Sequence, residues 1–206
     1  MSPLKIALSK GRQSKKAIEL FEQVGMDCSD VKQPGRRLIV PLDGGKYQVV
    51  LAKAPDVVTY VERGVVDVGI VGKDVILEQE NSSYEVLDLG FGVCRFVLAV
   101  PEGVDFFHTY KRRRVATKYP NITAKYFADR GMDVELIKIE GSVELSPLLG
   151  LADGIVDIVE TGETLRANGL REIDEIISVS ARVIVNPASM KTRKSEVNAL
   201  LEKINL

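Results

Sequence analysis

The sequence predicts an α/β protein with two lobes and mainly parallel sheets. Short apolar runs of strand length alternate along the chain with segments of helical periodicity. Several helical segments begin near a proline or end at a glycine, which are common at helix starts and stops respectively. No internal repeat or low-complexity tract interrupts this alternation. At 206 residues, the chain can form one domain or two small ones.

The expected strands are the apolar runs, which are bounded by turn residues. In chain order they are Lys5–Leu8, Leu38–Pro41, Gln48–Ala52, Asp67–Ile70, Tyr84–Leu89, Phe96–Val100, Arg114–Thr117, Val134–Ile139, Ile155–Val159 and Glu175–Val185. The expected helices lie between or after these runs, and the first three stop at glycines. They are Ser14–Val24, Pro55–Arg63, Pro120–Arg130, Glu163–Ala167 and Thr192–Ile204.

The division into lobes is predicted from two segments. Gly90-Phe91-Gly92 separates two groups of strand and helix units, and the long apolar run Ile176–Val185 would carry the chain back across the same boundary. The first lobe is therefore expected to contain residues 1–91 and 179–206, and the inserted second lobe residues 92–178. Ligands are expected in a cleft between the lobes.

Composition restricts the classes of partner. The chain carries 28 basic and 29 acidic residues and a formal net charge of -1, so it has no bulk field that would attract nucleic acid or an anionic membrane. The first ten residues resemble neither a secretory signal nor a membrane span. We therefore expect a cytoplasmic protein with neither nucleic acid nor a membrane as partner.

The cysteine and histidine content argues against two kinds of chemistry. Cys28 and Cys94 lie far apart without CxxC spacing, so a zinc knuckle or a redox pair is not expected, and both are read as small buried apolar residues. His108, the only histidine, lies in an expected surface loop with no nearby nucleophile to activate. We assign no metal ligands to this chain.

The most informative motif follows the strand Ile155–Val159. There the chain enters Thr161-Gly162-Glu163-Thr164, which opens a helix. Backbone N–H groups at a helix start lack intrahelical acceptors, so a phosphate would gain amide and hydroxyl donors there. Asp157 and Glu160 flank the loop and would repel bare phosphate, which favours a sugar phosphate or one with hydrated Mg²⁺. An ordinary N-cap at Thr161 explains the same residues equally well.

Two turns of the first lobe carry cations just after a strand. One is Ser9-Lys10-Gly11-Arg12 and the other is Val71-Gly72-Lys73-Asp74, and they are expected at the same sheet edge, where open α/β sheets bind ligands. Polyphosphate binding and a solvated basic turn are both consistent with the first. Lys53 and Asp56 follow a third strand, and Asp56 can equally complement a helix dipole.

The second lobe has comparable turns. Thr117-Lys118-Tyr119 and Gly141-Ser142-Val143-Glu144 each follow an expected strand, so together with the Thr161 loop they would surround one ligand. The densest positive run, Lys111–Arg114, has no interleaved aromatic residues of the kind that stack on nucleic-acid bases. We expect that run to be a solvated loop.

Six motifs, in order, resemble the short form of ATP phosphoribosyltransferase, the first enzyme of histidine biosynthesis. The resemblance extends over essentially the whole chain. The motifs are Ser9–Arg12 (SKGR), Asp56–Gly64 (DVVTYVERG), Asp67–Asp74 (DVGIVGKD), Arg114–Thr123 (RVATKYPNIT), Gly141–Leu151 (GSVELSPLLGL) and Asp157–Leu165 (DIVETGETL).

The resemblance implies an architecture like that of periplasmic binding proteins, and a site for phosphoribosyl pyrophosphate (PRPP). It implies that the loop Glu160-Thr161-Gly162-Glu163-Thr164-Leu165 holds the 5-phosphate, with Asp157 and Glu160 near the ribose. It also implies contacts to ATP or the leaving pyrophosphate from Lys10, Gly11, Arg12, Lys53, Gly72, Lys73 and Asp74, and an opposite wall of Thr117, Lys118 and Glu144.

The implied reaction is transfer of the phosphoribosyl group of PRPP to N1 of ATP, with Mg²⁺ accompanying both substrates. Lys10, Arg12 and Lys53 would be the catalytic cations that stabilise departing pyrophosphate. Lys53 stands where many relatives place an arginine. The short form further implies homo-oligomers and hetero-oligomers with a regulatory subunit similar to histidyl-tRNA synthetase.

Two other functions fit the architecture predicted from the residues. A non-enzymatic two-lobe protein could bind a small anion, and an effector-sensing module could use the same two lobes. Cationic turns on both lobes carry more charge than one small ligand needs, and no DNA-binding helix pair is evident in the sequence. These features favour the transferase.

Overall fold

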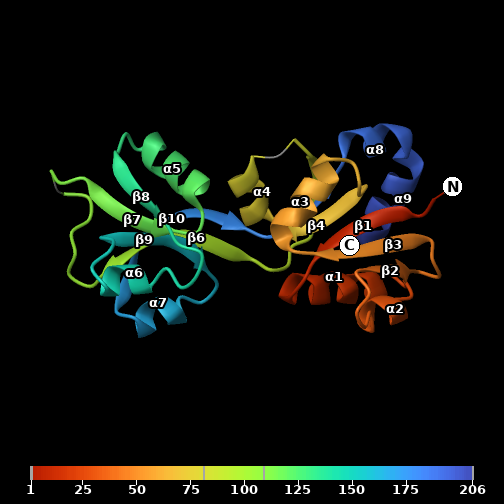
Figure 1. The fold of residues 1–206 in the computed structure, drawn as a ribbon, viewed down its shortest axis with the longest axis horizontal. Coiled ribbons are helices and arrows are strands. Elements are labelled where there is room, and N and C mark those ends of the chain that lie inside the picture. Colours follow the sequence, from red (N-terminus) through yellow and green to blue (C-terminus); the bar gives the residue numbers. More distant parts are fainter. Residues whose placement is uncertain (1, 81, 109, 206) are drawn as a thin grey trace. The chain divides into compact units, whose positions relative to one another are not determined.

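The computed structural model describes residues 2–80, 82–108 and 110–205, and it confirms the α/β class. The chain forms two compact units (Figure 1). Unit 1 contains Met1–Gly92 and Ser180–Leu206, and unit 2 contains Val93–Val179. The two boundaries predicted from the sequence each lie one residue before the observed ones. The chain crosses from unit 1 to unit 2 and back, so unit 2 is an uninterrupted insert.

Unit 1 is built on one sheet with the order β2-β3-β1-β4-β11-β5. Its central strand β1 pairs in parallel with β3 and β4, and the other pairs are antiparallel. The strands are β1 (Leu4–Ser9), β2 (Ile39–Leu42), β3 (Tyr47–Ala52), β4 (Val68–Gly72), β5 (Tyr84–Asp88) and β11 (Ala181–Val185).

Successive side chains of a strand point to opposite faces of the sheet, and here both sets are apolar. Helices therefore cover both faces. One face packs against α1 (Arg12–Gln23), α2 (Ser29–Lys32) and α9 (Lys194–Ile204), whose apolar stripes join one core with Ile6 and Ile70. The other face packs against α3 (Ala54–Glu62) and α4 (Lys73–Gln79). A short helix, α8 (Pro187–Thr192), begins where the Asn186 side chain accepts hydrogen bonds from the N–H groups of Ala188 and Ser189.

Unit 2 is built on a second sheet with the order β10-β6-β9-β7-β8. Strand β7 is parallel to β8 and β9, whereas β6 is antiparallel to β9 and β10. The strands are β6 (Cys94–Pro101), β7 (Arg113–Thr117), β8 (Val134–Lys138), β9 (Gly154–Val159) and β10 (Leu170–Val179). Helix α5 (Pro120–Asp129) lies on one face, and α6 (Leu145–Leu148) and α7 (Glu163–Ala167) lie on the other (Figure 1).

Both sheets are mixed, and the parallel pairing expected from the sequence is confined to β3-β1-β4 and β9-β7-β8. The single strand expected over 175–185 is two strands, β10 and β11, which belong to different sheets. They part at Ser180, whose hydroxyl donates to Asp88 Oδ1 at 2.7 Å. The helix expected to begin at Thr192 is α9, which begins at Lys194. Helices α2, α4, α6 and α8 were not predicted from the sequence.

Candidate functional site

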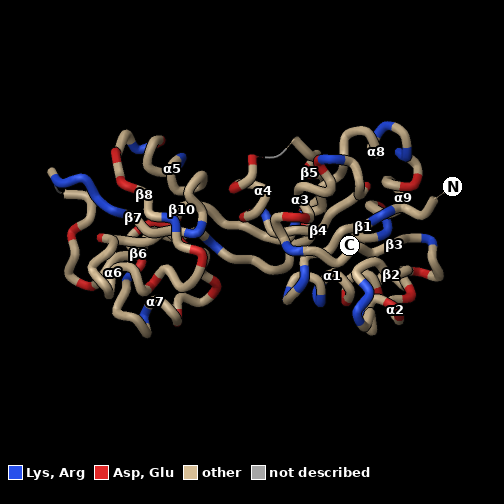
Figure 2. The backbone as a smooth tube through the Cα atoms, viewed as in Figure 1, with Lys and Arg blue, Asp and Glu red and all other residues tan. Residues whose placement is uncertain are grey.

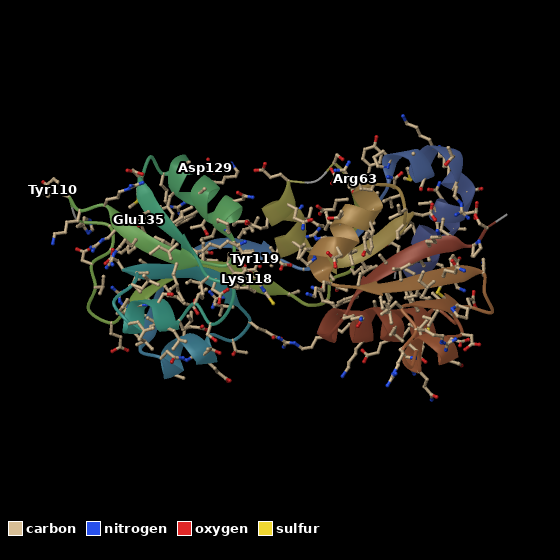
Figure 3. The ribbon with its side chains drawn as sticks, in the orientation of Figure 1. Arg63, Tyr110, Lys118, Tyr119, Asp129 and Glu135 are labelled. Atoms are coloured by element: carbon tan, nitrogen blue, oxygen red, sulfur yellow. The ribbon has the colours of Figure 1, made fainter. Side chains whose placement is uncertain are left out.

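The parallel strands of unit 2 end at one edge of the sheet, and their following turns lie there together. Thr117 at the end of β7 is in register with Lys138 of β8 and with Val156 of β9. Lys118 and Tyr119 directly follow β7, and Figure 3 shows them at one end of the unit, with Tyr110 at its other end. The turn that contains Glu144 follows β8, and Thr161 follows β9. This carboxyl-end edge is where open α/β sheets bind ligands.

The loop between β9 and α7 turns sharply at Gly162. Gly162 is the N-cap of α7 and has a φ of 75°, a left-handed conformation that favours glycine. The N-cap is therefore Gly162, and the alternative of an ordinary N-cap at Thr161 is not what the structure shows. The Thr161 hydroxyl oxygen only accepts a long hydrogen bond, 3.4 Å, from the N–H of Glu163. Thr161, Glu163 and Thr164 are exposed and can reach a ligand.

Asp157 lies near two other charged side chains of this edge. Burial raises the pKa of Asp157 from 3.8 to about 6, and the negative charge of Glu144 adds to this effect, while the N–H of Ile158 and the charge of Lys118 act against it. The charges of Glu144 and Lys118 therefore both act on Asp157. At neutral pH, Asp157 is ionised in a setting that penalises its charge, which is typical of functional sites.

Two residues of the expected site are buried inside their turns. Thr117 is 0% exposed, and its Oγ1 accepts hydrogen bonds from the N–H of Tyr119 at 2.9 Å and from Thr123 Oγ1 at 3.1 Å. Leu165 is 3% exposed and packs in the core of unit 2. The side chains of both residues support the loops on which the exposed residues stand, and neither lies at a surface where a ligand could touch it.

The parallel strands of unit 1 also end at one edge. Ser9 at the end of β1 is in register with Ala52 of β3, and the N–H of Lys10 donates to the Ala52 carbonyl at 2.9 Å. Lys10 and Lys53 line one groove of about 570 Å³, together with Asp56 and a set of apolar side chains. Two of the three cations assigned to catalysis therefore share a groove.

Gly11 and the exposed Arg12 complete the turn after β1, and Gly11 has a φ of 117°. The turn after β4 is less open. Gly72 is buried, and a Cβ atom on it would come within 2.8 Å of Gln13 Nε2 and collide with the Asp74 carboxylate. The ammonium of Lys73 is paired with the carboxylate of Glu85 on β5. Polyphosphate would therefore have to draw Lys73 away from Glu85.

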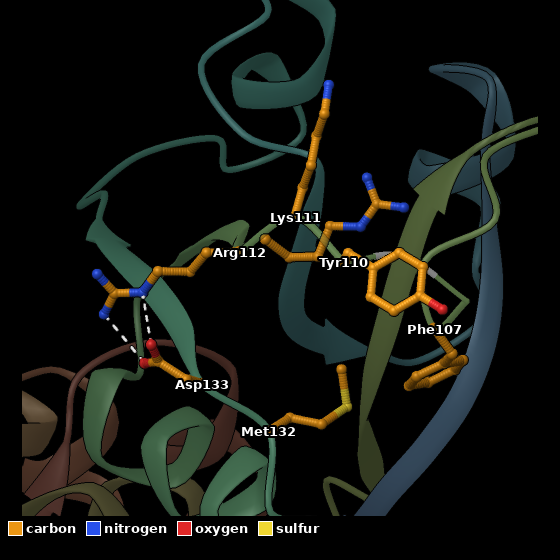
Figure 4. A pocket seen from close by; sticks show the side chains of 7 residues that line it. Phe107, Tyr110, Lys111, Arg112, Met132 and Asp133 are labelled. Atoms are coloured by element: carbon orange, nitrogen blue, oxygen red, sulfur yellow. Dashed lines mark hydrogen bonds and ion pairs between the residues drawn. The ribbon is translucent and has the colours of Figure 1, made fainter.

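The dense basic run Lys111–Arg114 precedes and enters β7, at the end of the sheet opposite Lys118. There a hollow of about 420 Å³ is lined by Phe107, Tyr110, Lys111, Arg112, Arg113, Met132 and Asp133 (Figure 4). Its arginines have partners in the protein. Arg112 pairs with Asp133 at 3.0 Å, Arg113 donates to the Phe106 and Asp105 carbonyls, and Arg114 pairs with Asp153 at 3.1 Å. The three arginines of the run are therefore held by hydrogen bonds and ion pairs to neighbouring residues.

Basic and acidic residues are interspersed over both units (Figure 2). Within the described residues, no group of three or more His, Cys, Asp or Glu side chains could hold a metal ion. Burial raises the pKa of Cys28 to about 11, so its thiol is protonated at neutral pH, whereas Cys94 is only partly buried. In the described part of the chain, no helix has the length and apolar character to span a bilayer.

One ion pair beside the loop between β9 and α7 could not be found from the sequence. Arg95 on β6 holds Glu172 on β10 through two hydrogen bonds of 2.5 and 3.0 Å, beside Gly162. The two residues are 77 positions apart in the chain, so no local spacing could have connected them.

The chain is similar to known proteins along its whole length. The family model described as ATP phosphoribosyltransferase matches residues 53–206. The ATP phosphoribosyltransferase of Clostridium kluyveri is 56% identical over 203 residues, covering 98% of this chain and 93% of that protein. The Bacillus cereus enzyme of the same name is 53% identical, covering 98% of this chain and 95% of that protein.

Two solved structures resemble the fold. The ATP phosphoribosyl transferase (HisG:HisZ) complex from Thermotoga maritima contains a chain that superposes with a TM-score of 0.84 and 36% identity, covering 98% of this chain and 96% of that one. The alkanesulfonate-binding protein SsuA from Xanthomonas axonopodis superposes with a TM-score of 0.59 and 12% identity, covering 100% of this chain and 72% of that one. The second likeness concerns the fold alone, and it matches the architecture expected from the sequence.

Proposed function

Because this chain belongs to the ATP phosphoribosyltransferase family, we propose that it transfers the phosphoribosyl group of PRPP to N1 of ATP. The products are phosphoribosyl-ATP and pyrophosphate, and the reaction is the first step of histidine biosynthesis. The observation that carries this proposal is the match itself, which covers 98% of the chain at 56% identity. ATP and PRPP as substrates favour a cytoplasmic location.

PRPP is held by unit 2 through the loop Glu160–Leu165. The exposed Thr161 and Thr164 supply hydroxyl donors to the 5-phosphate, and the backbone N–H groups that open α7 supply further donors. Asp157 and Glu160 accept hydrogen bonds from the ribose hydroxyls. Support for this assignment comes from the left-handed Gly162 turn, which places these donors at the carboxyl end of β9.

Unit 1 supplies the cations for departing pyrophosphate. Lys10 and Lys53 share a groove, and Arg12 follows on the same turn as Lys10. In unit 1 we assign Gly11, Gly72, Lys73 and Asp74 to ATP. In unit 2 we assign Lys118 and Glu144 to ATP. Gly72 contributes its backbone and close packing, and Thr117 acts indirectly by fixing the turn that bears Lys118.

Adenine N1 has a lone pair, so its attack on C1 of PRPP with inversion needs no strong general base. This suits a chain whose only histidine is in an exposed loop beside Asp105. Positive charge develops on the ribose as the bond to pyrophosphate breaks, and the ionised Asp157 favours that charge. The chain's task is electrostatic and positional: it orients two substrates and stabilises opposite charges at the two ends of the breaking bond.

Mg²⁺ accompanies the substrates in this proposal. The ion usually binds through one or two carboxylates and completes its shell with water and substrate phosphates. Asp157 and Glu144 fit that pattern, because both are carboxylates at this edge of the unit 2 sheet and the charge of Glu144 raises the pKa of Asp157. Bound Mg²⁺ would neutralise part of the diphosphate charge of PRPP.

A regulatory partner is part of the proposal. The Thermotoga maritima relative is a HisG:HisZ complex, and this chain covers 96% of the superposed chain of that complex. We place this chain in homo-oligomers and in a hetero-oligomer with a regulatory subunit similar to histidyl-tRNA synthetase.

The test is release of pyrophosphate from ATP and PRPP, measured with and without the regulatory subunit. We expect release that requires both substrates and rises when the subunit is added. A two-lobe anion-binding protein would bind PRPP or a related anion and release no pyrophosphate under either condition, and that result would overturn the enzyme assignment.

A further inference from the structure

An ion pair lies beside the Gly162 turn of the phosphate loop (Glu160–Leu165). The guanidinium of Arg95 on β6 donates to both carboxylate oxygens of Glu172 on β10, at 2.5 and 3.0 Å, and it approaches Glu175 Oε2 at 3.6 Å. Both partners are partly buried, with 31% and 28% of their side chains exposed. A two-pronged contact of this kind fixes the orientation of the carboxylate as well as its position.

The pair is in contact with the loop at Gly162. Arg95 is in register with Val159, the last residue of β9, so its strand position adjoins the point where the loop starts. A Cβ atom on Gly162 would come within 2.7 Å of Glu172 Oε1 and 3.0 Å of an Arg166 guanidinium nitrogen. The Glu172 carboxylate therefore fills the space beside Gly162 that any other residue would need.

This arrangement has two physical consequences. A carboxylate close to a phosphate site repels the ligand, and pairing with a guanidinium removes most of that repulsion. In addition, the fixed carboxylate acts as a support against which Gly162 packs, so the loop donors are held in one arrangement before the ligand arrives. Without Arg95, both the support and the charge balance would be lost.

Building on the proposed function, we propose that Arg95 and Glu172 are positioning residues for PRPP. They touch neither the substrate nor the reacting atoms. Their pair keeps the Gly162 turn in place and keeps the charge of Glu172 away from the 5-phosphate. The pair therefore sets the affinity for PRPP and leaves the affinity for ATP unchanged.

The experiment compares Arg95→Met, Glu172→Gln and the double variant in the full chain with its regulatory subunit. Arg95→Met removes the two-pronged partner of the Glu172 carboxylate beside the loop, so the KM for PRPP should rise about tenfold or more, with the KM for ATP within about twofold. Glu172→Gln removes the charge and keeps the shape, so its effect on PRPP should be about threefold or less. The double variant should bind PRPP better than Arg95→Met, because the unpaired charge is gone.

A matched control is available on the same strand. Arg130 pairs with Asp174 of β10 at 2.5 Å, with 40% and 30% of their side chains exposed, and packs over Tyr126 of α5. Arg130→Met breaks a comparable pair next to α5, away from the phosphate loop. It should leave the KM for PRPP within about twofold, while lowering the thermal stability about as much as Arg95→Met does.

Direct PRPP binding by calorimetry separates failure of this inference from failure of the proposed function. Should wild-type protein neither bind PRPP nor release pyrophosphate, the function itself is wrong. Normal wild-type activity with unchanged PRPP affinity in Arg95→Met would overturn only the positioning role, as would equal losses of ATP and PRPP affinity. If Arg95→Met fails to fold, Arg95→Lys offers a one-pronged contact, and the KM for PRPP alone must then rise about threefold or more.

Discussion

The two ends of the unit 2 sheet both carry many charges but use them differently. At the end where β7 begins, Arg112, Arg113 and Arg114 are each bound by a carboxylate or a carbonyl of the protein. At the end where β7 and β9 finish, burial and Glu144 push the pKa of Asp157 up to about 6. The first end satisfies its charges internally, and the second keeps a charge that the protein alone stabilises poorly.

This difference teaches that charge density along the sequence is a poor guide to a site. The run of four basic residues is the densest in the chain, yet its arginines stabilise loops and strand ends. A partly buried carboxylate whose pKa is raised by burial is more informative, because a substrate can supply the missing stabilisation. Four substitutions test the comparison, and they are ordered from the largest expected effect.

Asp157→Asn should have the largest effect, in opposite directions on activity and stability. Losing one electrostatic contact to the transition state lowers kcat/KM about a hundredfold, roughly 3 kcal/mol. Because the folded pKa of about 6 lies above the ordinary value of 3.8, the wild-type loses stability as pH rises from 3.8 to 6 and stays at the lower level above that. Asparagine removes this penalty.

Chemical denaturation of Asp157→Asn and wild-type at pH 8 and pH 3.5 measures the stability change. The variant should be more stable by about 1 to 3 kcal/mol at pH 8, with little difference at pH 3.5. A variant that is less stable at pH 8 would show that Asp157 is well satisfied by the protein, and the contrast between the two ends would disappear.

Thr164→Val should act on one substrate. It removes an exposed hydroxyl from the phosphate loop and keeps the side-chain shape, so the KM for PRPP should rise about tenfold while that for ATP changes little. Steady-state kinetics with each substrate varied in turn gives both constants. Equal changes in both would refute the loop assignment.

Arg114→Met should affect stability alone. The Arg114 side chain contacts Asp153 and the Gly150 carbonyl, and Asp153 is 26% exposed, so its loss should cost about 1 to 2 kcal/mol of unfolding free energy. The value of kcat/KM at saturating partner subunit should stay within about twofold. A large kinetic defect in a well-folded Arg114→Met protein would place function at the amino end of β7.

Arg112→Gln should have the smallest effect. Its partner Asp133 is 79% exposed, and ion pairs of this kind contribute about 0 to 1 kcal/mol. Thermal unfolding in low and high salt should show a small difference that shrinks as the salt concentration rises. A loss of several degrees would mean that the hollow at this end has a structural role beyond the pair.

Much of the fold could be predicted because strand and helix signals are local. Pro120 and Gly131 mark the limits of helix α5, which ends at Asp129. The return crossing was placed within one residue of Ser180, but the division of the run into two strands was not predicted, because Val179, Ser180 and Ala181 contain neither glycine nor proline. What separates β10 from β11 is the exchange of partners, from β6 in one sheet to β4 and β5 in the other, and pairing of this kind depends on distant residues.

The placement of the candidate residues was predictable at the level of turns and less so at the level of side chains. The strand-end rule brought Lys118, Glu144 and Asp157 to one edge. It could not show that Thr117 is buried, because a threonine after a strand can face either way until the helix behind it is placed. Helix α8 was missed although Asn186-Pro187 is a recognisable start signal, since Asn186 caps the helix and proline fits its first turn.

The strand order of unit 1 also determines when that unit can be completed on the ribosome. Strand β5 pairs with β11 and not with β4, so in the described sheet it has no neighbour until residues 181–185 have been synthesised. Unit 2, by contrast, is contiguous from Val93 to Val179, so all of its strands are synthesised before β11. A nascent chain must therefore carry an incomplete first sheet, with one edge of β4 unpaired, while the inserted unit folds. Unit 1 is thus the first unit to begin synthesis and the last to complete its sheet.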